Sequence, residues 1–235
     1  MHEFAQAFRL ALDLVFSANP DLMEIVGLSL RVSLTAVAVS CLIGFPLGAA
    51  AGAWRFPGRG AIAVLMNALM SLPPVVVGLL VYLTFSRAGP FGWLELLYTP
   101  TAMIIAQIVL VTPIVAALSR QIIEDLHSEY AEQFRSLCVG PGRAIGALLW
   151  DGRFSLLTVA LAGFGRAIAE VGAVIIVGGN IDHLTRVMTT AIALETSRGD
   201  LALALALGIV LIAIALSVNG AVMALRGTAA RFAYA

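Results

Sequence analysis

Long apolar stretches alternate with shorter polar ones along this chain, and the apolar stretches dominate. A helix needs about 20 apolar residues to cross the hydrocarbon core of a bilayer. The stretches that qualify are residues 26–53, 61–85, 101–118, 155–177 and 201–225. Leucine alternates with alanine at the start of the last stretch, as in a strand, but its length favours a helix. The pattern therefore predicts an all-α polytopic membrane protein with about five transmembrane helices.

Composition supports this class and narrows the chemistry. Hydrophobic residues make up 60% of the chain and charged residues 12%, with a mean hydropathy of +0.99, which is typical of membrane proteins. The chain contains no lysine, so it lacks the residue that a phosphate-binding P-loop or a Schiff-base enzyme requires. No aspartate falls inside a predicted span, and all three histidines fall in predicted loops, which disfavours an intramembrane hydrolase. We expect no catalytic residue, metal site or cofactor of its own.

Arginine placement predicts the orientation. With the N-terminus outside, the cytoplasmic side holds Arg55, Arg59, Arg120, Arg135, Arg143, Arg153, Arg226 and Arg231. The outer side then holds only Arg9, Arg87, Arg186 and Arg198. Because cytoplasmic loops are enriched in basic residues, this excess favours N-out and C-in.

The same analysis divides the chain into regions. Residues 1–24 are interpreted as an outer-surface amphipathic segment, with Phe4, Phe8, Ala11, Leu12 and Val15 on one helical stripe. Residues 25–228 form a single transmembrane domain with a cytoplasmic loop at 120–153, and residues 229–235 form a cytoplasmic tail. The N-terminus has neither a basic segment nor a cleavage site, so we expect no removable signal peptide.

The loop at 120–153 contains a second, shorter pattern. Tyr130, Phe134, Leu137 and Cys138 recur at helical spacing, which predicts a short amphipathic helix. The segment Gly140-Pro141-Gly142 breaks that helix, and a second helical stretch follows at 143–150. Such a helix can fit a groove on another protein or rest on lipid headgroups, and both interpretations stay open on physical grounds.

This loop resembles the cytoplasmic loop of the permease subunits of binding-protein-dependent ABC importers. The consensus there is Glu-Ala-Ala, three residues, then Gly; Glu132 matches the glutamate, whereas Gln133, Phe134 and Cys138 depart from the alanines and the glycine. The stretches SLRVSLTAVAVSCLIGFPLG and SLPPVVVGLLVYL also look like this family. Residues 170–212 resemble permeases of tungstate importers in particular, with molybdate and sulfate permeases as relatives.

The resemblance implies a type I, molybdate-permease-like fold in the inner (plasma) membrane. It implies a homodimer of this chain, two copies of a cytoplasmic ABC ATPase that bind ATP and Mg, and an extracytoplasmic oxyanion-binding protein. By the same resemblance, the loop of this chain that couples it to the ATPase would contact that partner through Tyr130, Glu132, Phe134, Leu137, Cys138, Gly140 and Arg143. The expected function is alternating-access import of a tetrahedral oxyanion, most readily tungstate, with molybdate or sulfate as alternatives. An ATP-independent channel is the alternative from a different functional class. Nucleic-acid binding is not supported, because the sequence shows no cytoplasmic basic patch with interleaved aromatic residues.

Four motifs inside the predicted spans and outer loops carry further hypotheses, each with a plainer alternative. Pro73 and Pro74 interrupt the second span and predict either a pathway gate or a packing kink. Arg166 and Glu170 predict either an internal ion pair or, through Arg166, an anion guide.

Thr185 and Arg186 offer donors to an oxyanion at the outer mouth, although they are also ordinary loop residues. Gly44, Gly48 and Gly52 form a small-residue stripe that predicts close helix packing within the chain or a seam between two copies.

Overall fold

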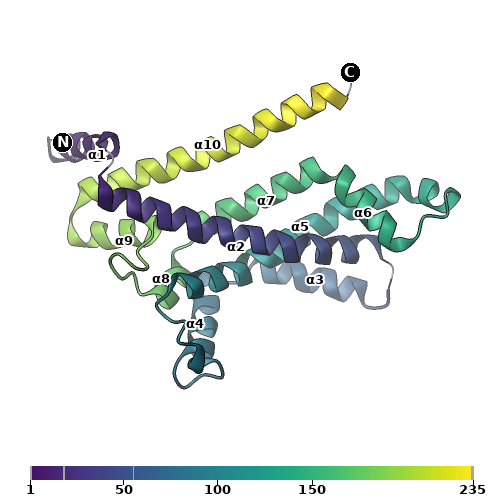
Figure 1. Cartoon of the computed structure of the whole chain (residues 1–235), viewed down its shortest axis with the longest axis horizontal. Helices are drawn as coiled ribbons and strands as arrows, with labels where there is room; N and C mark the ends of the chain where they lie inside the picture. Colours follow the sequence, from purple (N-terminus) through teal and green to yellow (C-terminus); the bar gives the residue numbers. More distant parts are fainter. Residues whose placement is uncertain (1, 18, 55, 234–235) are drawn as a thin grey trace. The chain divides into compact units, whose positions relative to one another are not determined.

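The computed structural model is a set of helices joined by short connections (Figure 1). It describes the backbone of residues 2–17, 19–54 and 56–233. Side chains are described only for those of these residues that lie between 8 and 224. Arg55 and residues 234–235 of the predicted tail lie outside the described residues, as do the side chains of Phe4, Arg226 and Arg231. The elements are α1 (His2–Phe16), α2 (Pro20–Ala53), α3 (Arg59–Met70), α4 (Pro74–Phe85), η1 (Gly92–Leu94), α5 (Pro100–Ser136), α6 (Pro141–Asp151), α7 (Arg153–Ile168), α8 (Gly172–Gly178), α9 (Met188–Arg198) and α10 (Leu201–Ala233).

Within the described residues, three helices are long and apolar enough to cross a membrane: α2, α5 and the 201–224 part of α10. Two bent pairs, α3 with α4 and α6 with α7, pass the same test only when each pair is taken together. The all-α polytopic fold is therefore confirmed. The lengths allow up to five crossings, so the count of five and the N-out orientation remain predictions.

Helix α2 begins earlier than the sequence pattern predicted. Asn19 caps its first turn, because its side-chain oxygen accepts hydrogen bonds from the backbone N–H of Asp21 at 2.9 Å and of Leu22 at 3.4 Å. The predicted end at Ala53 is confirmed. There Arg59 takes over as a cap, because its Nε and Nη2 donate to the carbonyls of Ala51 and Gly52 at 2.9 and 2.7 Å.

Helix α5 differs from the prediction of a short third span followed by a separate loop helix. It continues without a break from Pro100 to Ser136, so the amphipathic segment is the end of one long helix (Figure 1). The prediction of a separate helix was wrong because no glycine or proline lies between Pro113 and Gly140, and the polar residues after 118 include good helix formers. The membrane helix and the loop therefore share one rigid element.

The chain forms two compact units: residues 1–35, 74–107 and 168–221, and residues 36–73, 108–167 and 222–235. In the second unit, the glycine stripe of α2 packs against α5. A Cβ added at Gly44 would lie 2.7 Å from Cγ1 of Val115, and one at Gly52 would lie 2.8 Å from the carbonyl oxygen of Arg120. The stripe therefore serves packing within the chain, the plainer of its two interpretations.

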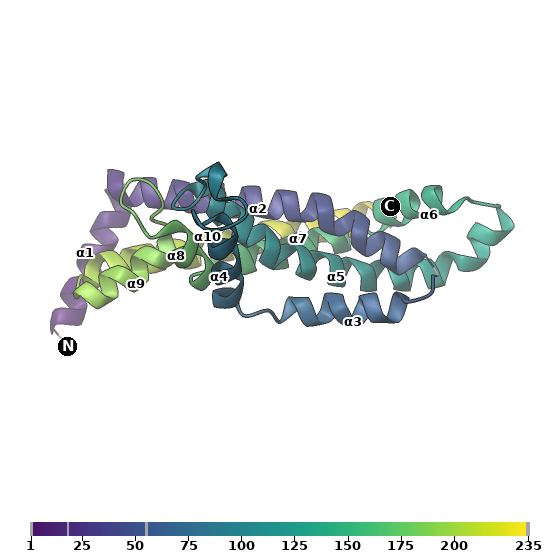
Figure 2. The ribbon, with the colours of Figure 1, turned by 90° about the horizontal axis from the view of Figure 1, so that it is seen from below.

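Other contacts complete this second unit. The hydroxyl of Ser119 donates to the carbonyl of Val115 at 2.6 Å and also contacts the carbonyl of Gly44 at 3.4 Å. Helix α3 runs alongside α5 (Figure 2), where Nη2 of Arg59 and Oε1 of Glu124 form an ion pair of 3.0 Å.

In the first unit, α4 packs closely on α8. A Cβ at Gly78 would lie 2.8 Å from the Cα of Ala173, so glycine permits backbone contact between the two helices. Gly179 ends α8 in the left-handed conformation, with φ +72°. The Tyr98 ring would contact any Cβ at Gly179, and the Tyr98 N–H donates to the carbonyl of Val177 at 2.9 Å. These contacts hold the α4–α5 connection against the end of α8.

Candidate functional site

The turn between α5 and α6 is built on a residue in the left-handed conformation. Cys138 has φ +50°, and its N–H donates to the carbonyl of Arg135 at 3.2 Å. The N–H of Val139 donates to the carbonyl of Phe134 at 2.9 Å, which completes the hydrogen-bond pair of a Schellman motif. Cys138 thus occupies the position that most often holds glycine. This geometry explains why a glycine suits the consensus position with which Cys138 aligns.

Helix α6 starts directly after this turn. Gly140 is its N-cap residue in an extended conformation, and Pro141 takes the first helical position, where a missing N–H costs least. The predicted break is therefore confirmed. It lies at 137–140, and Pro141 begins the next helix instead of ending the previous one.

Half of the apolar stripe of the predicted loop helix, Tyr130 and Phe134, packs against other residues of the second unit. Tyr130 and Phe134 pack against a cluster in which Ala49, Ala53, Ile123 and Leu148 are buried. The ring centroids of Tyr130 and Phe134 lie 6.0 Å apart. Burial of these rings joins α2, α5 and α6, so their first role is to hold the hairpin together.

A hydrogen bond closes the same hairpin. The Tyr130 hydroxyl donates to Oδ2 of Asp151 at 2.8 Å, which links α5 to the last residue of α6. The neighbouring carboxylate raises the pKa of Tyr130, first through this hydrogen bond and then through its charge. Tyr130 therefore stays protonated and keeps its hydrogen to donate.

The other predicted coupling residues point into solvent. Glu132, Leu137, Cys138, Gly140 and Arg143 are exposed, and the Leu137 side chain keeps 73% of its surface accessible. An exposed leucine beside a charged residue at the tip of a rigid hairpin is a surface that a partner can cover. The structure thus separates the predicted set into internal residues, Tyr130 and Phe134, and outward residues around Leu137.

A groove of about 630 Å³ lies beside the hairpin, lined by residues of α2, α3, α5, the turn and α6. Glu124 stands at its wall between two arginines, with Arg59 at 3.0 Å and Arg120 at 2.5 Å. His127 and Arg135 also line it. The sequence analysis did not find the role of Glu124 or Asp151, because Glu124 meets Arg59 of α3 and Asp151 meets Tyr130 of α5, contacts between residues of different helices.

The predicted gate motif forms a break between helices. Helix α3 ends at Met70, and Pro74 is the first residue of α4. Pro73 and Pro74 can sit there because neither position has to donate within a continuous helix. The break is confirmed, and a gating role remains a prediction.

Glu170 lies in a break between two helices. The continuous span predicted over 155–177 was wrong: α7 ends at Ile168, and α8 begins at Gly172. Buried Glu170 lies in the break and accepts a hydrogen bond from the N–H of Ala173 at 3.1 Å, while its carbonyl accepts one from the Thr189 hydroxyl at 2.8 Å. Glu170 therefore caps α8. Arg166 lies in the last turn of α7, and its role as a partner or anion guide remains a prediction.

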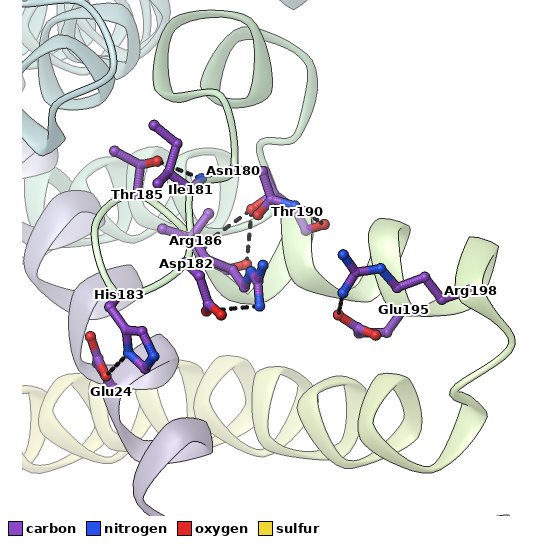
Figure 3. A network of polar contacts seen from close by, with 11 residues as sticks. Glu24, Asn180, Ile181, Asp182, His183, Thr185, Arg186, Thr190, Glu195 and Arg198 are labelled. Atoms are coloured by element: carbon purple, nitrogen blue, oxygen red, sulfur yellow. Dashed lines mark hydrogen bonds and ion pairs between the residues drawn. The ribbon is translucent and has the colours of Figure 1, made fainter.

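The loop between α8 and α9 contains the predicted outer-mouth residues (Figure 3). The fully buried Thr185 donates its only hydroxyl hydrogen to the carbonyl of Gly178 at 2.6 Å and accepts from the N–H of Ile181 at 2.9 Å. In this conformation Thr185 has no hydrogen left for an anion, so its contact with an oxyanion is disfavoured. Nη1 of Arg186 pairs with Oδ1 of Asp182 at 2.8 Å, which offsets its charge.

The same loop is tied to α2 by a histidine. Nδ1 of His183 lies 2.9 Å from Oε2 of Glu24, and both side chains are exposed (Figure 3). The pKa of His183 is raised, first by the hydrogen bond with Glu24 and then by the charges of Glu24 and Asp182. Within the described ranges, no group of three or more His, Cys, Asp or Glu residues is arranged to hold a metal ion.

Comparison with known proteins identifies the family. Residues 44–227 match the model of the "Binding-protein-dependent transport system inner membrane component" family. The chain is 41% identical to the tungstate uptake system permease protein TupB of Peptoclostridium acidaminophilum over 96% of its own length and 99% of that protein's length. It is 39% identical to a probable anion ABC transporter permease protein of Haloferax volcanii, over 84% and 88% of the two lengths.

A third relative extends this agreement. The chain is 37% identical to the TupB permease protein of Campylobacter jejuni, over 83% of this chain and 82% of the relative. A component of this kind is a transporter subunit, and it works with a binding protein and the ATPase of an ABC transporter. By the family match and these three alignments, the chain belongs to the inner membrane components of binding-protein-dependent transport systems.

Proposed function

We propose that this chain is the permease subunit of an ATP-driven importer of tetrahedral oxyanions, with tungstate as its cargo. The observation that carries the proposal is the alignment with a tungstate uptake permease along nearly the whole of both chains. This chain is only 25–31% identical to sulfate and molybdenum permeases of Escherichia coli, Synechocystis sp. and Azotobacter vinelandii. These alternatives therefore enter as competitors in the test.

The arrangement of α5 supports a mechanical role. One unbroken helix runs from an apolar segment long enough to cross a membrane to the turn at Cys138. The hairpin is internally fastened by the Tyr130 and Phe134 contacts. A push on its tip would thus be transmitted along α5 rather than absorbed by a flexible loop. We assign the tip around Leu137 as the surface on which the ATPase acts, and alternating access as the mechanism.

Two copies of this chain would form the pathway, with two copies of the ATPase on the cytoplasmic side. This stoichiometry fits the general preference of protein assemblies for twofold symmetry, which is best documented for soluble oligomers. Pro73 and Pro74, with Arg166, are the proposed pathway residues, because a break between helices and a cation inside an apolar segment both need water or protein around them.

The experiment is uptake into vesicles that hold the permease with its neighbouring ATPase and its binding protein. ATP-dependent tungstate uptake that excess sulfate does not displace is the expected result. A matched vesicle with a hydrolysis-deficient ATPase provides the control. Equal flux in that control would favour the channel alternative, and uptake displaced equally by sulfate or molybdate would overturn the choice of cargo.

A further inference from the structure

A second groove lies on the second unit, between α2 and α7. It has a volume of about 530 Å³, within the range of about 300–1,000 Å³ of ligand clefts. One wall comes from α2, with Leu42 and Phe45, and the other from α7, with Leu156 and Leu157. Leu42 keeps 76% of its side-chain surface accessible. The groove is therefore open at the surface of this unit.

One cation stands at the end of this groove. Among the described residues that line it, Arg153 alone is charged. Arg153 is the first residue of α7, after a bend of 72° from α6. Its guanidinium carbon lies 4.8 Å from the ring centroid of Trp150 and 4.6 Å from that of Phe154.

The remaining donors of Arg153 are available. Nη1 donates to the carbonyl of Trp150 at 2.7 Å, and no carboxylate of the described residues lies within ion-pair distance of Arg153. Guanidinium groups bind phosphate oxygens through several N–H donors at once. The Trp150 side chain, 72% exposed, is typical of the aromatic residues that mark the boundary between lipid and water.

We propose that this groove binds an anionic phospholipid. An acyl chain lies along α2 and α7 against Leu42 and Leu157, and the headgroup phosphate contacts Arg153. The apolar walls and the single cation together argue for a lipid. The walls suit an acyl chain, because they belong to a membrane component. Arg153 suits a headgroup, because it stands at the start of an apolar helix beside Trp150, an aromatic residue typical of the membrane interface. A second copy of this chain is the competing occupant.

The test uses the full chain in nanodiscs that contain phosphatidylglycerol and phosphatidylcholine in equal amounts. Native mass spectrometry then measures which lipid stays bound after mild detergent extraction. We expect phosphatidylglycerol to be enriched on the wild type. In Arg153→Gln this enrichment should fall about fivefold, which is the usual effect of removing one basic residue near an anionic lipid surface. Arg153→Lys keeps the charge and most of the enrichment.

Arg143→Gln is the matched control, because Arg143 is an exposed arginine of α6 outside the groove. It should leave the enrichment unchanged. Equal enrichment in wild type and Arg153→Gln would overturn the proposal. Cys41, which lines the groove, tests the competing occupant in a Cys138→Ser background. Efficient cross-linking of two Cys41 thiols by a short bis-maleimide would show that a second copy covers the groove and would also overturn it.

Discussion

The hydroxyl of Tyr130 donates a 2.8 Å hydrogen bond to the carboxylate of Asp151, a residue 21 positions later in the chain. This bond joins the end of α5 to the end of α6 across the turn at Cys138. The Phe134 ring lies beside it and packs on the cluster around Leu148. The hairpin is therefore fastened twice, once by a polar bond and once by apolar packing.

Loss of the polar bond should loosen the hairpin without unfolding the chain. Tyr130→Phe keeps the ring in the cluster but removes the hydrogen that Asp151 accepts. We expect faster hydrogen exchange across residues 137–145 and lower ATP-dependent uptake, with unchanged expression. Asp151→Asn keeps an acceptor oxygen and should behave like the wild type. If Tyr130→Phe and Asp151→Ala have fully additive effects in a double-mutant cycle, the bond does not couple the two helices.

Replacing Cys138 with glycine should stabilise the turn. A residue other than glycine in the left-handed region costs about 1–2 kcal/mol, and Cys138 sits there with φ +50°. Cys138→Gly removes this strain, although glycine adds entropy to the unfolded chain. We expect the thermal midpoint to rise slightly, and that of Cys138→Val to fall, because a β-branched side chain tolerates this conformation worst. A lower midpoint for Cys138→Gly would mean that the thiol itself contributes to the turn.

Local signals in the sequence predicted several features correctly. The end of α2 at Ala53 and the break before Pro74 each depend on residues adjacent in the chain. The α5–α6 turn was also predicted, because glycine and proline act on their own neighbourhood.

Features that depend on distant partners were not predictable in the same way. The burial of Thr185 follows from its bond to Gly178, and the cap by Glu170 follows from the break before α8. Periodicity assigned Tyr130 and Phe134 to an outward stripe, but it cannot distinguish a partner protein from the chain's own α2 and α6 as the covering surface.

The contact between α2 and α5 should not tolerate a methyl group. A Cβ at Gly48 would overlap the Ser119 hydroxyl and lie 2.5 Å from the carbonyl oxygen of Ala116, and a backbone atom cannot move aside easily. Gly48→Ala should lower the free energy of unfolding by about 1–3 kcal/mol, the usual cost of overpacking. Gly27→Ala is the matched control in the same helix, because nothing lies within 4 Å of its added Cβ. Equal thermal midpoints for the two variants would contradict the observed packing.

The contact of His183 with Glu24 should depend on pH. The pKa of His183 is raised above its ordinary value of about 6.5. The charged contact is therefore fully present below the ordinary value and is lost as pH rises through the raised one. The charges of Asp182 and Asp21 act in the same direction. Arg186 lines a small pocket together with His183, but it is paired with Asp182.

Hydrogen exchange across residues 181–185 would measure this dependence. We expect stronger protection at acidic pH in the wild type, after the exchange rates are corrected for the intrinsic pH dependence of amide exchange. Glu24→Gln removes the main cause of the raised pKa, so the midpoint of the pH profile should move down. The same midpoint in the wild type and in Glu24→Gln would show that Glu24 does not raise the pKa of His183.

The hairpin tip provides the sharpest test of coupling, because the structure separates its internal residues from its outward ones. Glu132 and Leu137 are exposed, whereas Phe134 packs on the cluster around Leu148. Glu132→Ala with Leu137→Ala should leave the thermal midpoint unchanged and weaken ATPase binding at least fivefold, since truncating an important interface residue costs more than about 1 kcal/mol. Phe134→Ala should lower the midpoint, and its loss in free energy of unfolding should be smaller than the cost of about 3–5 kcal/mol for a fully buried ring.

Co-purification with the ATPase and ATP-dependent uptake give two independent readouts. If the outward double variant binds the ATPase and transports like the wild type, the partner does not act on this tip. If Phe134→Ala loses coupling at an unchanged midpoint, Phe134 must leave its own cluster to meet the partner, and the tip then opens during transport.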